Sequence, residues 1–289
     1  MTISRSLVWL SLLITALALL AAGLGVFWQS PGSSFPFTTV RGETVTIYGL
    51  DLYRYDTVFI ARGFMGKDAV ILLIGVPLLV ASAWYYRRGS LRGGLLLLGT
   101  LGYFLYAYAS TALSAAYNNL FLLNVALFSA SFFAFLLAFA SFDREALARY
   151  TEELPRRGPA AFMFASALVI LVVWGLPLLL ALARDEAPPG LESYTTMYTH
   201  AVDLAIIGPA AIIAGLLILR RQILGYLIAL GLLVLEIMLA PLITAQTIYQ
   251  LSYGLTLTPA EIIGPVASFA VLGLAAIWVL AAILRPLRD

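Results

Sequence analysis

The sequence predicts an all-α protein, an eight-span transmembrane helix bundle, and three observations support this prediction. Of the 289 residues, 62% are hydrophobic and only 11% are charged, whereas soluble domains carry about 25% charged residues. A chain with so few charges cannot cover a globule with polar surface, so its solvent is lipid. Eight separate apolar stretches also reach the length of about 20 residues that a helix needs to cross a bilayer. We therefore expect a multi-pass protein of the cell membrane.

The predicted spans are residues 6–28, 69–86, 93–114, 119–141, 160–183, 199–219, 223–245 and 260–284. The first span follows Arg5 and ends near small residues, which is the pattern of a signal peptide. Its apolar run is longer than that of a usual signal peptide, so we interpret it as an uncleaved anchor. Cleavage would leave seven spans with the same remaining topology.

The positions of the basic residues predict the orientation of the bundle. Twelve of the 17 basic residues lie in loops on one side: Arg5, Arg87, Arg88, Arg92, Arg144, Arg149, Arg156, Arg157, Arg220, Arg221, Arg285 and Arg288. The opposite loops hold Arg41, Arg54, Arg62, Lys67 and Arg184, most of them near acidic residues. Because cytoplasmic loops carry the excess of Lys and Arg, we expect the N and C termini to be cytoplasmic.

The first outer loop, residues 29–68, is expected to hold a small β-hairpin-like structure. Polar and apolar residues alternate from Thr39 to Tyr48, as in a strand, and Gly49 then breaks the run. We expect a short interfacial helix near residues 56–62 to follow, and Asp68 to cap the second span. The last outer loop ends in a capping box, with Thr258 as N-cap and Glu261 at the third helical position.

Two segments of the chain resemble each other, one starting at Lys67 and one at His200. Each has an acid near its start, Asp68 or Asp203, then Gly and Pro, an arginine pair and a second apolar helix. We interpret them as a parallel 4+4 internal repeat, whose groove between halves is the natural ligand site. The alternative is that any helix hairpin in lipid carries proline kinks and cytoplasmic arginines. The repeat would divide the chain into a first four-span half at 1–141, a cytoplasmic linker at 142–158 and a second four-span half at 159–289.

Hydroxyl groups share one face of the third span. They recur every three or four residues, which places them on one side of a helix: Thr100, Tyr103, Tyr106, Ser110, Ser114 and Tyr117. This face must contact protein or a wet cavity, and three asparagines follow it. We expect Tyr103, Tyr106, Ser110 and Asn124 to line a pocket. The alternative is helix packing held by hydroxyl hydrogen bonds of about 0.6 kcal/mol each.

Glu236 lies near the centre of the seventh predicted span, within the string GLLVLEIMLAP. An ionised side chain there costs about 2.5–3.5 kcal/mol. Asp203 lies about one turn below the outer surface on the sixth span, with His200 on the same face. Lys67 is expected at the membrane boundary, so no basic residue is expected deep enough to pair with Glu236. We expect His200, Asp203 and Glu236 to line an outward-facing pocket, with Glu236 as a proton or cation site. The alternatives are a protonated Glu236 with a structural role and an Asp203 that only anchors its helix.

The residue types that the chain lacks exclude several functions. Without cysteine there is no disulfide, iron–sulfur cluster or thiolate zinc site. A single histidine rules out a haem held by two histidines of this chain and an HExxH zinc site. We therefore expect no metal and no cofactor. The net charge of +2, without a basic cluster among aromatic residues, also predicts no nucleic-acid partner.

Three strings, YYRRGSLRGGLLLLGTLGYFLYAYAS, AYNNLFLLNVALF and VDLAIIGPAAIIAGLLILRRQILGY, resemble a family of uncharacterised polytopic prokaryotic integral membrane proteins. The resemblance covers residues 43–245. It implies a multi-helix bundle with an outer loop after the first span. It implies no assigned activity, so no functional residue is carried over.

Three functions remain, in this order. The first is a transporter or binder of a small, cationic solute or proton in the outward-facing polar pocket, with the tyrosine faces adding cation–π attraction. The second is a non-catalytic sensor or a subunit of a larger membrane assembly, which would contact its partner through Tyr48, Tyr53 and Tyr55 of the outer loop. The third is an intramembrane enzyme using its two acids. It ranks last because no nucleophile motif, metal cluster or phosphate-binding glycine loop is present.

Overall fold

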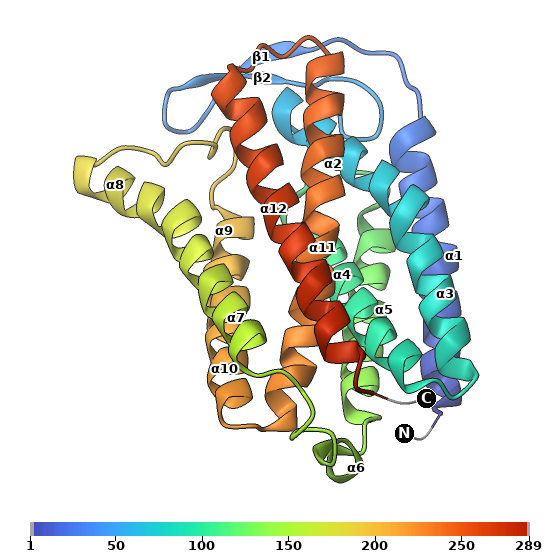
Figure 1. Cartoon of the computed structure of the whole chain (residues 1–289). Coiled ribbons are helices and arrows are strands. Elements are labelled where there is room, and N and C mark those ends of the chain that lie inside the picture. The colour runs from blue at the N-terminus through green and yellow to red at the C-terminus, as the bar shows by residue number, and fades with distance from the viewer. Residues whose placement is uncertain (1–2, 288–289) are drawn as a thin grey trace.

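A computed structural model describes residues 3–287, and these form a helix bundle with a small two-stranded sheet at one end (Figure 1). Within this range, eight helices are long and apolar enough to cross a membrane: Arg5–Phe27, Val58–Arg87, Leu91–Ser114, Phe121–Ala140, Arg157–Arg184, Tyr198–Leu219, Ile223–Ser252 and Glu261–Leu284. This is the architecture of a multi-pass membrane protein. The number of predicted spans is confirmed.

The elements follow one another along the chain as α1 (Arg5–Phe27), β1 (Phe35–Thr38), β2 (Thr44–Ile47), α2 (Val58–Val70), η1 (Ile71–Gly75), α3 (Val76–Arg87), α4 (Leu91–Ser114), α5 (Phe121–Ala140), α6 (Arg144–Ala148), α7 (Arg157–Ile170), η2 (Leu171–Gly175), α8 (Leu176–Arg184), α9 (Tyr198–Val202), η3 (Asp203–Ile207), α10 (Gly208–Leu219), α11 (Ile223–Ser252) and α12 (Pro259–Leu284). Here η marks a five-residue π-helical turn. α1 begins and α12 ends at the end of the bundle that carries α6, opposite the sheet (Figure 1). We call the sheet-bearing end the hairpin end.

The predicted hairpin is confirmed, although it starts earlier than expected. β1 and β2 pair antiparallel, with Phe35 opposite Ile47 and Thr38 opposite Thr44. The alternating run contributes only β2, because residues 39–43 form the turn, in which Gly42 takes a φ of +84° that only glycine adopts without strain. Of the three loop tyrosines expected to contact a partner, Tyr48 and Tyr53 are buried in a small core with Leu52, and only Tyr55 is exposed.

The second span starts eleven residues earlier than predicted. No separate interfacial helix precedes it, because α2 continues through η1 into α3 without a break. Asp68 therefore lies inside the helix and is buried, so its predicted role as an N-cap is wrong. Thr57 occupies the N-cap position instead. The charges of α2 made this segment look like a loop, but they point into the protein rather than into lipid.

Three of the eight spans contain a π-turn just before a proline. η1, η2 and η3 are followed by Pro77, Pro177 and Pro209, each within the first two residues of the next helix. A proline lacks the N–H of a regular helix and clashes with the carbonyl one turn earlier, and a wider turn separates the two groups. Pro241 and Pro265 lie inside α11 and α12 without such a turn.

The centre of the bundle is the contact between α4 and α11, the two most buried spans. Glycines allow close approach here: a Cβ added to Gly99 would lie 2.7 Å from the carbonyl oxygen of Leu230. Near the hairpin end, α2 packs on α11 in the same way, because a Cβ on Gly66 would lie 2.6 Å from the amide nitrogen of Gln246. The span formed by α7, η2 and α8 is the least buried, and α8 tilts away from the other helices toward the hairpin end (Figure 1).

The predicted capping box at the start of α12 is confirmed, since Thr258 and Glu261 exchange both hydrogen bonds. Within the predicted linker 142–158, a short helix, α6, spans Arg144–Ala148, with Asp143 as its N-cap. Turns then lead to α7.

Candidate functional site

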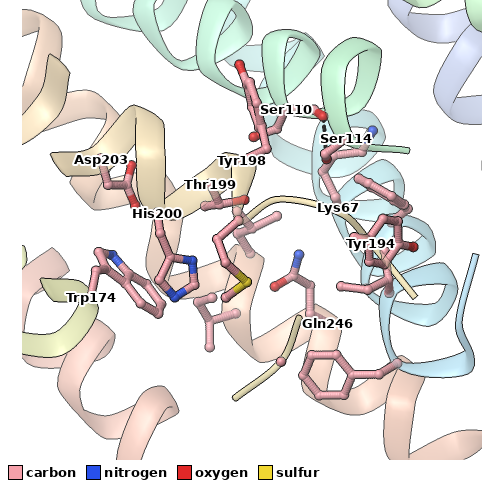
Figure 2. Close-up of a pocket in the computed structure, with 18 of the residues that line it drawn as sticks. Lys67, Ser110, Ser114, Trp174, Tyr194, Tyr198, Thr199, His200, Asp203 and Gln246 are labelled. Atoms are coloured by element: carbon pink, nitrogen blue, oxygen red, sulfur yellow. Dashed lines mark hydrogen bonds between the residues drawn. The ribbon is translucent and has the colours of Figure 1, made fainter. Parts of the chain in front are cut away.

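A cavity of about 1160 Å³ lies between the helices in the half of the bundle nearest the hairpin end. Residues of α2, α4, α7, η2, α9, η3, α11 and α12 line it. Residues 185–197, which connect α8 to α9 and which we call the cover segment, close part of it from the hairpin end. Most of the wall is apolar, and the polar side chains come from separate helices (Figure 2).

Five of the seven predicted site residues line this cavity: Tyr106, Ser110, His200, Asp203 and Glu236. The other two do not. Tyr103 is fully buried against Phe104, with a ring-centroid distance of 5.8 Å, and Asn124 is buried on α5. A hydroxyl stripe at helical spacing covers about a third of a helix surface, and on α4 the cavity meets only the part of the stripe that faces α9. Tyr117 lies beyond the end of α4 and is exposed.

Asp203 is the first residue of η3 and is held by two aromatic side chains. The Tyr106 hydroxyl donates a hydrogen bond to Asp203 Oδ2 at 3.4 Å, and the Trp174 side chain lies beside the same carboxyl. Trp174 also contacts the ring of His200, with centroids 4.5 Å apart. Figure 2 shows Trp174, His200 and Asp203 gathered on one side of the cavity. Asp203 is therefore a fixed carboxyl with part of its hydrogen-bonding capacity already used.

Glu236 lies deeper in the cavity wall and has fewer partners. Its side chain comes from α11 and is more than nine-tenths buried. Ser166 on α7 faces it, yet among the residues the structure describes neither Glu236 Oε2 nor Ser166 Oγ completes a hydrogen bond. The other cavity residues on these helices and on α12 at this level are apolar, including Val169, Leu239 and Leu272.

Lys67 is buried in the cavity wall and lies inside the long second helix, whereas the sequence predicts it before the start of that helix. It is 4% exposed, and Nζ lies 2.9 Å from Asp68 Oδ1 and 2.7 Å from Thr111 Oγ1. The rings of Phe64 and Tyr108 lie within 5.5 Å of it. Asp68 in turn accepts a hydrogen bond from Tyr53 at 2.5 Å. The sequence analysis missed this pair because it placed both residues before the start of the helix.

The pairing of Lys67 decides the charge balance of the cavity. Lys67 is the only lysine or arginine among the lining residues, and its charge is compensated by Asp68. Asp203 and Glu236 have no ion-pair partner within the described part of the chain. The charge left uncompensated in the wall is therefore acidic.

The cover segment is tied to the loop and hairpin between α1 and α2 and to the start of α2. Tyr194 donates a hydrogen bond to Asp56 Oδ1 at 2.6 Å, and Thr57 donates to the carboxyl of Glu192. Arg41 donates to the backbone oxygens of Glu192 and Tyr194, at 2.6 and 3.2 Å. These bonds hold the segment over the cavity.

Asp56 joins three elements at this closure. It is fully buried, and it also accepts a hydrogen bond from the backbone N–H of Ala116, just beyond α4, at 2.8 Å. Burial raises the pKa of Asp56 to about 6, although the hydrogen bonds from Tyr194 and Ala116 act in the opposite direction. Burial raises the pKa of Glu192 as well, while its bond with Thr57 opposes the shift. Both acids of the closure therefore favour the protonated form more than free carboxyls do.

No group of three or more histidine, aspartate or glutamate side chains that could hold a metal ion occurs between residues 3 and 287. No protein-family model, no curated protein and no solved structure matches the chain. The resemblance to a family of polytopic prokaryotic membrane proteins therefore stays a prediction.

Proposed function

We propose that this chain binds a small amphipathic cation in the cavity near the hairpin end, as a transporter or a solute-binding membrane protein. The observation that carries the proposal is a cavity of about 1160 Å³ whose wall is mostly apolar and whose uncompensated charges are carboxyls. Asp203 and Glu236 are buried in the wall, and Glu261 lines it from an exposed position at the start of α12. Ligand sites are usually apolar clefts of about 300–1,000 Å³ with a few polar groups. A molecule with an apolar body and one positive group matches these features.

The aromatic side chains support a cation as the charged group. Trp174 and Tyr198 line the cavity on the same side as Asp203 (Figure 2), and Tyr106 contacts the Asp203 carboxyl. The faces of such rings attract positive charge. Burial strengthens the attraction between a cation and a carboxyl, because little water is present to screen it.

The shape of the bundle supports entry of an apolar solute. Val173 of η2 and Phe269 of α12 line the cavity, while α8, which follows η2, tilts away from the bundle (Figure 1). Leu179 and Leu182 of α8 are 64% and 79% exposed, as expected for side chains in lipid. We propose that the solute reaches the cavity from the membrane, between α8 and α12, while the cover segment closes the hairpin end.

Binding of tetraphenylphosphonium, a lipophilic cation, to the purified full-length chain in detergent tests the proposal. We expect saturable binding that the Asp203→Asn variant weakens about tenfold or more, as for the loss of a charge-assisted contact. The matched control is Glu43→Gln, which removes an exposed acid of the hairpin turn outside the cavity. Absence of saturable binding, or equal binding by both variants, would contradict the proposal.

We also propose that the two halves of the chain are parallel repeats, as the sequence predicts. Two sets of elements support it, each a π-turn followed by two long helices: η1, α3 and α4, and η3, α10 and α11. Their start residues, Ile71, Val76 and Leu91 against Asp203, Gly208 and Ile223, keep the same offset. The second set differs at its beginning, where the cover segment and the short α9 stand in place of the long α2. The cavity lies beside this difference.

A further inference from the structure

The deepest polar part of the cavity is formed by Glu236 and Ser166. Both side chains are more than nine-tenths buried, at 8% and 4% exposure, and both line the cavity. Glu236 Oε2 and Ser166 Oγ each lack a hydrogen-bond partner in the described part of the protein. Buried polar atoms without a partner cost about 1–3 kcal/mol each, so two such atoms on residues that line one cavity indicate a ligand group that supplies hydrogen bonds to both.

The two buried acids of the cavity, Asp203 and Glu236, differ in what they offer to such a group. The Asp203 carboxyl already receives a hydrogen bond from Tyr106 and lies beside Trp174, and these contacts hold it in place. The Glu236 carboxyl has a free oxygen, and a hydroxyl that can also accept lies opposite. A carboxyl oxygen without a partner can accept a charge-assisted hydrogen bond from the ligand, which favours Glu236.

The chemistry of the pair selects a donor with several N–H groups. An ionised carboxyl only accepts hydrogen bonds, and a serine hydroxyl accepts them as well as donating one. A primary ammonium presents three N–H donors and one positive charge, so it can reach both oxygens at once. A quaternary ammonium carries the same charge but no N–H. The surrounding Val169, Leu239 and Leu272 suit an alkyl chain and exclude water.

We propose that Glu236 and Ser166 form the headgroup subsite of the cavity and that it recognises a primary ammonium group on an alkyl chain. The inference rests on the proposed function and narrows it from any amphipathic cation to one that donates hydrogen bonds. Asp203 positions the aromatic wall and contributes long-range attraction.

Two probes with the same octyl chain distinguish recognition by the headgroup subsite from binding elsewhere in the cavity. n-Octylamine and octyltrimethylammonium are both cations at neutral pH, and each is titrated against bound tetraphenylphosphonium on the full-length chain. We expect wild type to prefer octylamine by about tenfold or more, since hydrogen bonds to a charged group carry this difference. Glu236→Gln and Ser166→Ala should each lose most of the preference.

The matched control is Ser131→Ala. Ser131 is also a fully buried serine whose hydroxyl lacks a partner in the part of the chain described, but it lies on α5 outside the cavity. It should keep the wild-type preference. If Glu236→Gln does not fold, the preference measured on Ser166→Ala tests the subsite, because this substitution removes only one hydroxyl.

Three outcomes overturn the subsite. They are an equal affinity of wild type for the two probes, an unchanged preference in both variants, and failure of octylamine to displace bound tetraphenylphosphonium. In each case the cavity still binds a lipophilic cation, so the proposed function stands and only the assignment to Glu236 and Ser166 fails. Absence of tetraphenylphosphonium binding to wild type would instead remove both proposals.

Discussion

At the level of single residues, the buried ionisable side chains of the bundle differ in whether the protein supplies their partners. Lys67 is surrounded by a carboxyl, a hydroxyl and two aromatic rings, so its charge is satisfied within the protein. Glu236 has an oxygen without a partner among the described residues. A charged group whose partners lie within the protein, such as Lys67, stabilises the fold. A carboxyl oxygen without a partner beside a cavity, such as that of Glu236, is available to a ligand.

The first prediction concerns Lys67. Lys67→Met keeps the length of the side chain but leaves Asp68 buried with Tyr53 as its remaining partner. Removing one member of a buried ion pair costs about 3–5 kcal/mol, so we expect the thermal unfolding midpoint in detergent to fall by several degrees. The double variant with Asp68→Asn should recover part of the loss, because no unpaired charge remains.

Arg221→Gln is the matched control for this prediction. Arg221 and Glu152 form an ion pair whose side chains are 36% and 79% exposed, and exposed pairs contribute about 0–1 kcal/mol. Equal midpoints for the two single variants would show that Lys67 does not stabilise the bundle through its charge.

Part of the site could be predicted from single residues, and part could not. Acids and hydroxyls in apolar spans must face protein or a cavity, and this places Asp203, Glu236 and Tyr106 at the cavity wall. Periodicity alone cannot separate the part of a polar face that meets the cavity from the part packed in the core, which is why Tyr103 was included. Ser166 was missed because a single serine in an apolar helix carries no pattern.

At the level of elements, the cover segment is the part of the cavity wall that depends on few contacts. It has no regular secondary structure between Asp185 and Met197, and hydrogen bonds to Asp56, Thr57 and Arg41 hold it in place. Segments with few buried apolar contacts open more readily than helices do. Opening of the cavity at the hairpin end therefore depends on the closure around Asp56.

The second prediction follows from the pKa of Asp56. Burial raises that pKa from its ordinary value of 3.8 to about 6 in the closed structure, and an exposed Asp56 in an open structure returns to the ordinary value. Protonation thus stabilises the closed state, fully below the ordinary pKa, and this stabilisation is lost as the pH rises through 6. We expect the open fraction to increase about tenfold between pH 5 and pH 8.

Thiol labelling can measure this opening, because the chain contains no cysteine. A cysteine introduced at Ser193, in the cover segment, is labelled with maleimide at each pH, and the rate is divided by that of the unfolded chain. Asp56→Asn should weaken the pH dependence, and the double variant with Glu192→Gln should remove it, because Glu192 shifts in the same direction. A labelling ratio that stays constant from pH 5 to pH 8 in the wild type would contradict the prediction.

The element boundaries show what apolar runs reveal and what they hide. The spans without internal charges were predicted within a few residues, as at α4 and α5. α2 was predicted too short because Arg62, Lys67 and Asp68 interrupt its apolar run, although the protein buries the last two. The π-turns were not predicted either, since a proline shows where a helix must adapt but not whether it widens or kinks.

At the level of the whole molecule, the orientation in the membrane is set by charges that lie at the two ends of the bundle. The end with α6 carries Arg87, Arg88, Arg220 and Arg221 among its loops. This distribution predicts that the hairpin end faces outward. The helix count follows from composition, whereas the side of the membrane needs a separate experiment.

The third prediction tests this orientation with single cysteines. Ser33→Cys lies in the exposed segment before β1, and Glu153→Cys lies in the exposed segment after α6. In intact cells, a membrane-impermeant maleimide should label the cysteine at position 33 and not the one at 153, whereas both react after the membrane is permeabilised. Labelling of position 153 alone in intact cells would reverse the orientation.

The apolar wall of the cavity has a consequence for every affinity measured on this protein. Val169, Val173 and Leu272 would contact the tail of a bound solute, and they would contact an acyl chain equally well. Under the proposed entry between α8 and α12, lipid or detergent tails compete for the same space. A measured dissociation constant then describes the exchange of the solute for a hydrocarbon tail. It should be larger in detergents or lipids whose tails fill the cavity more completely.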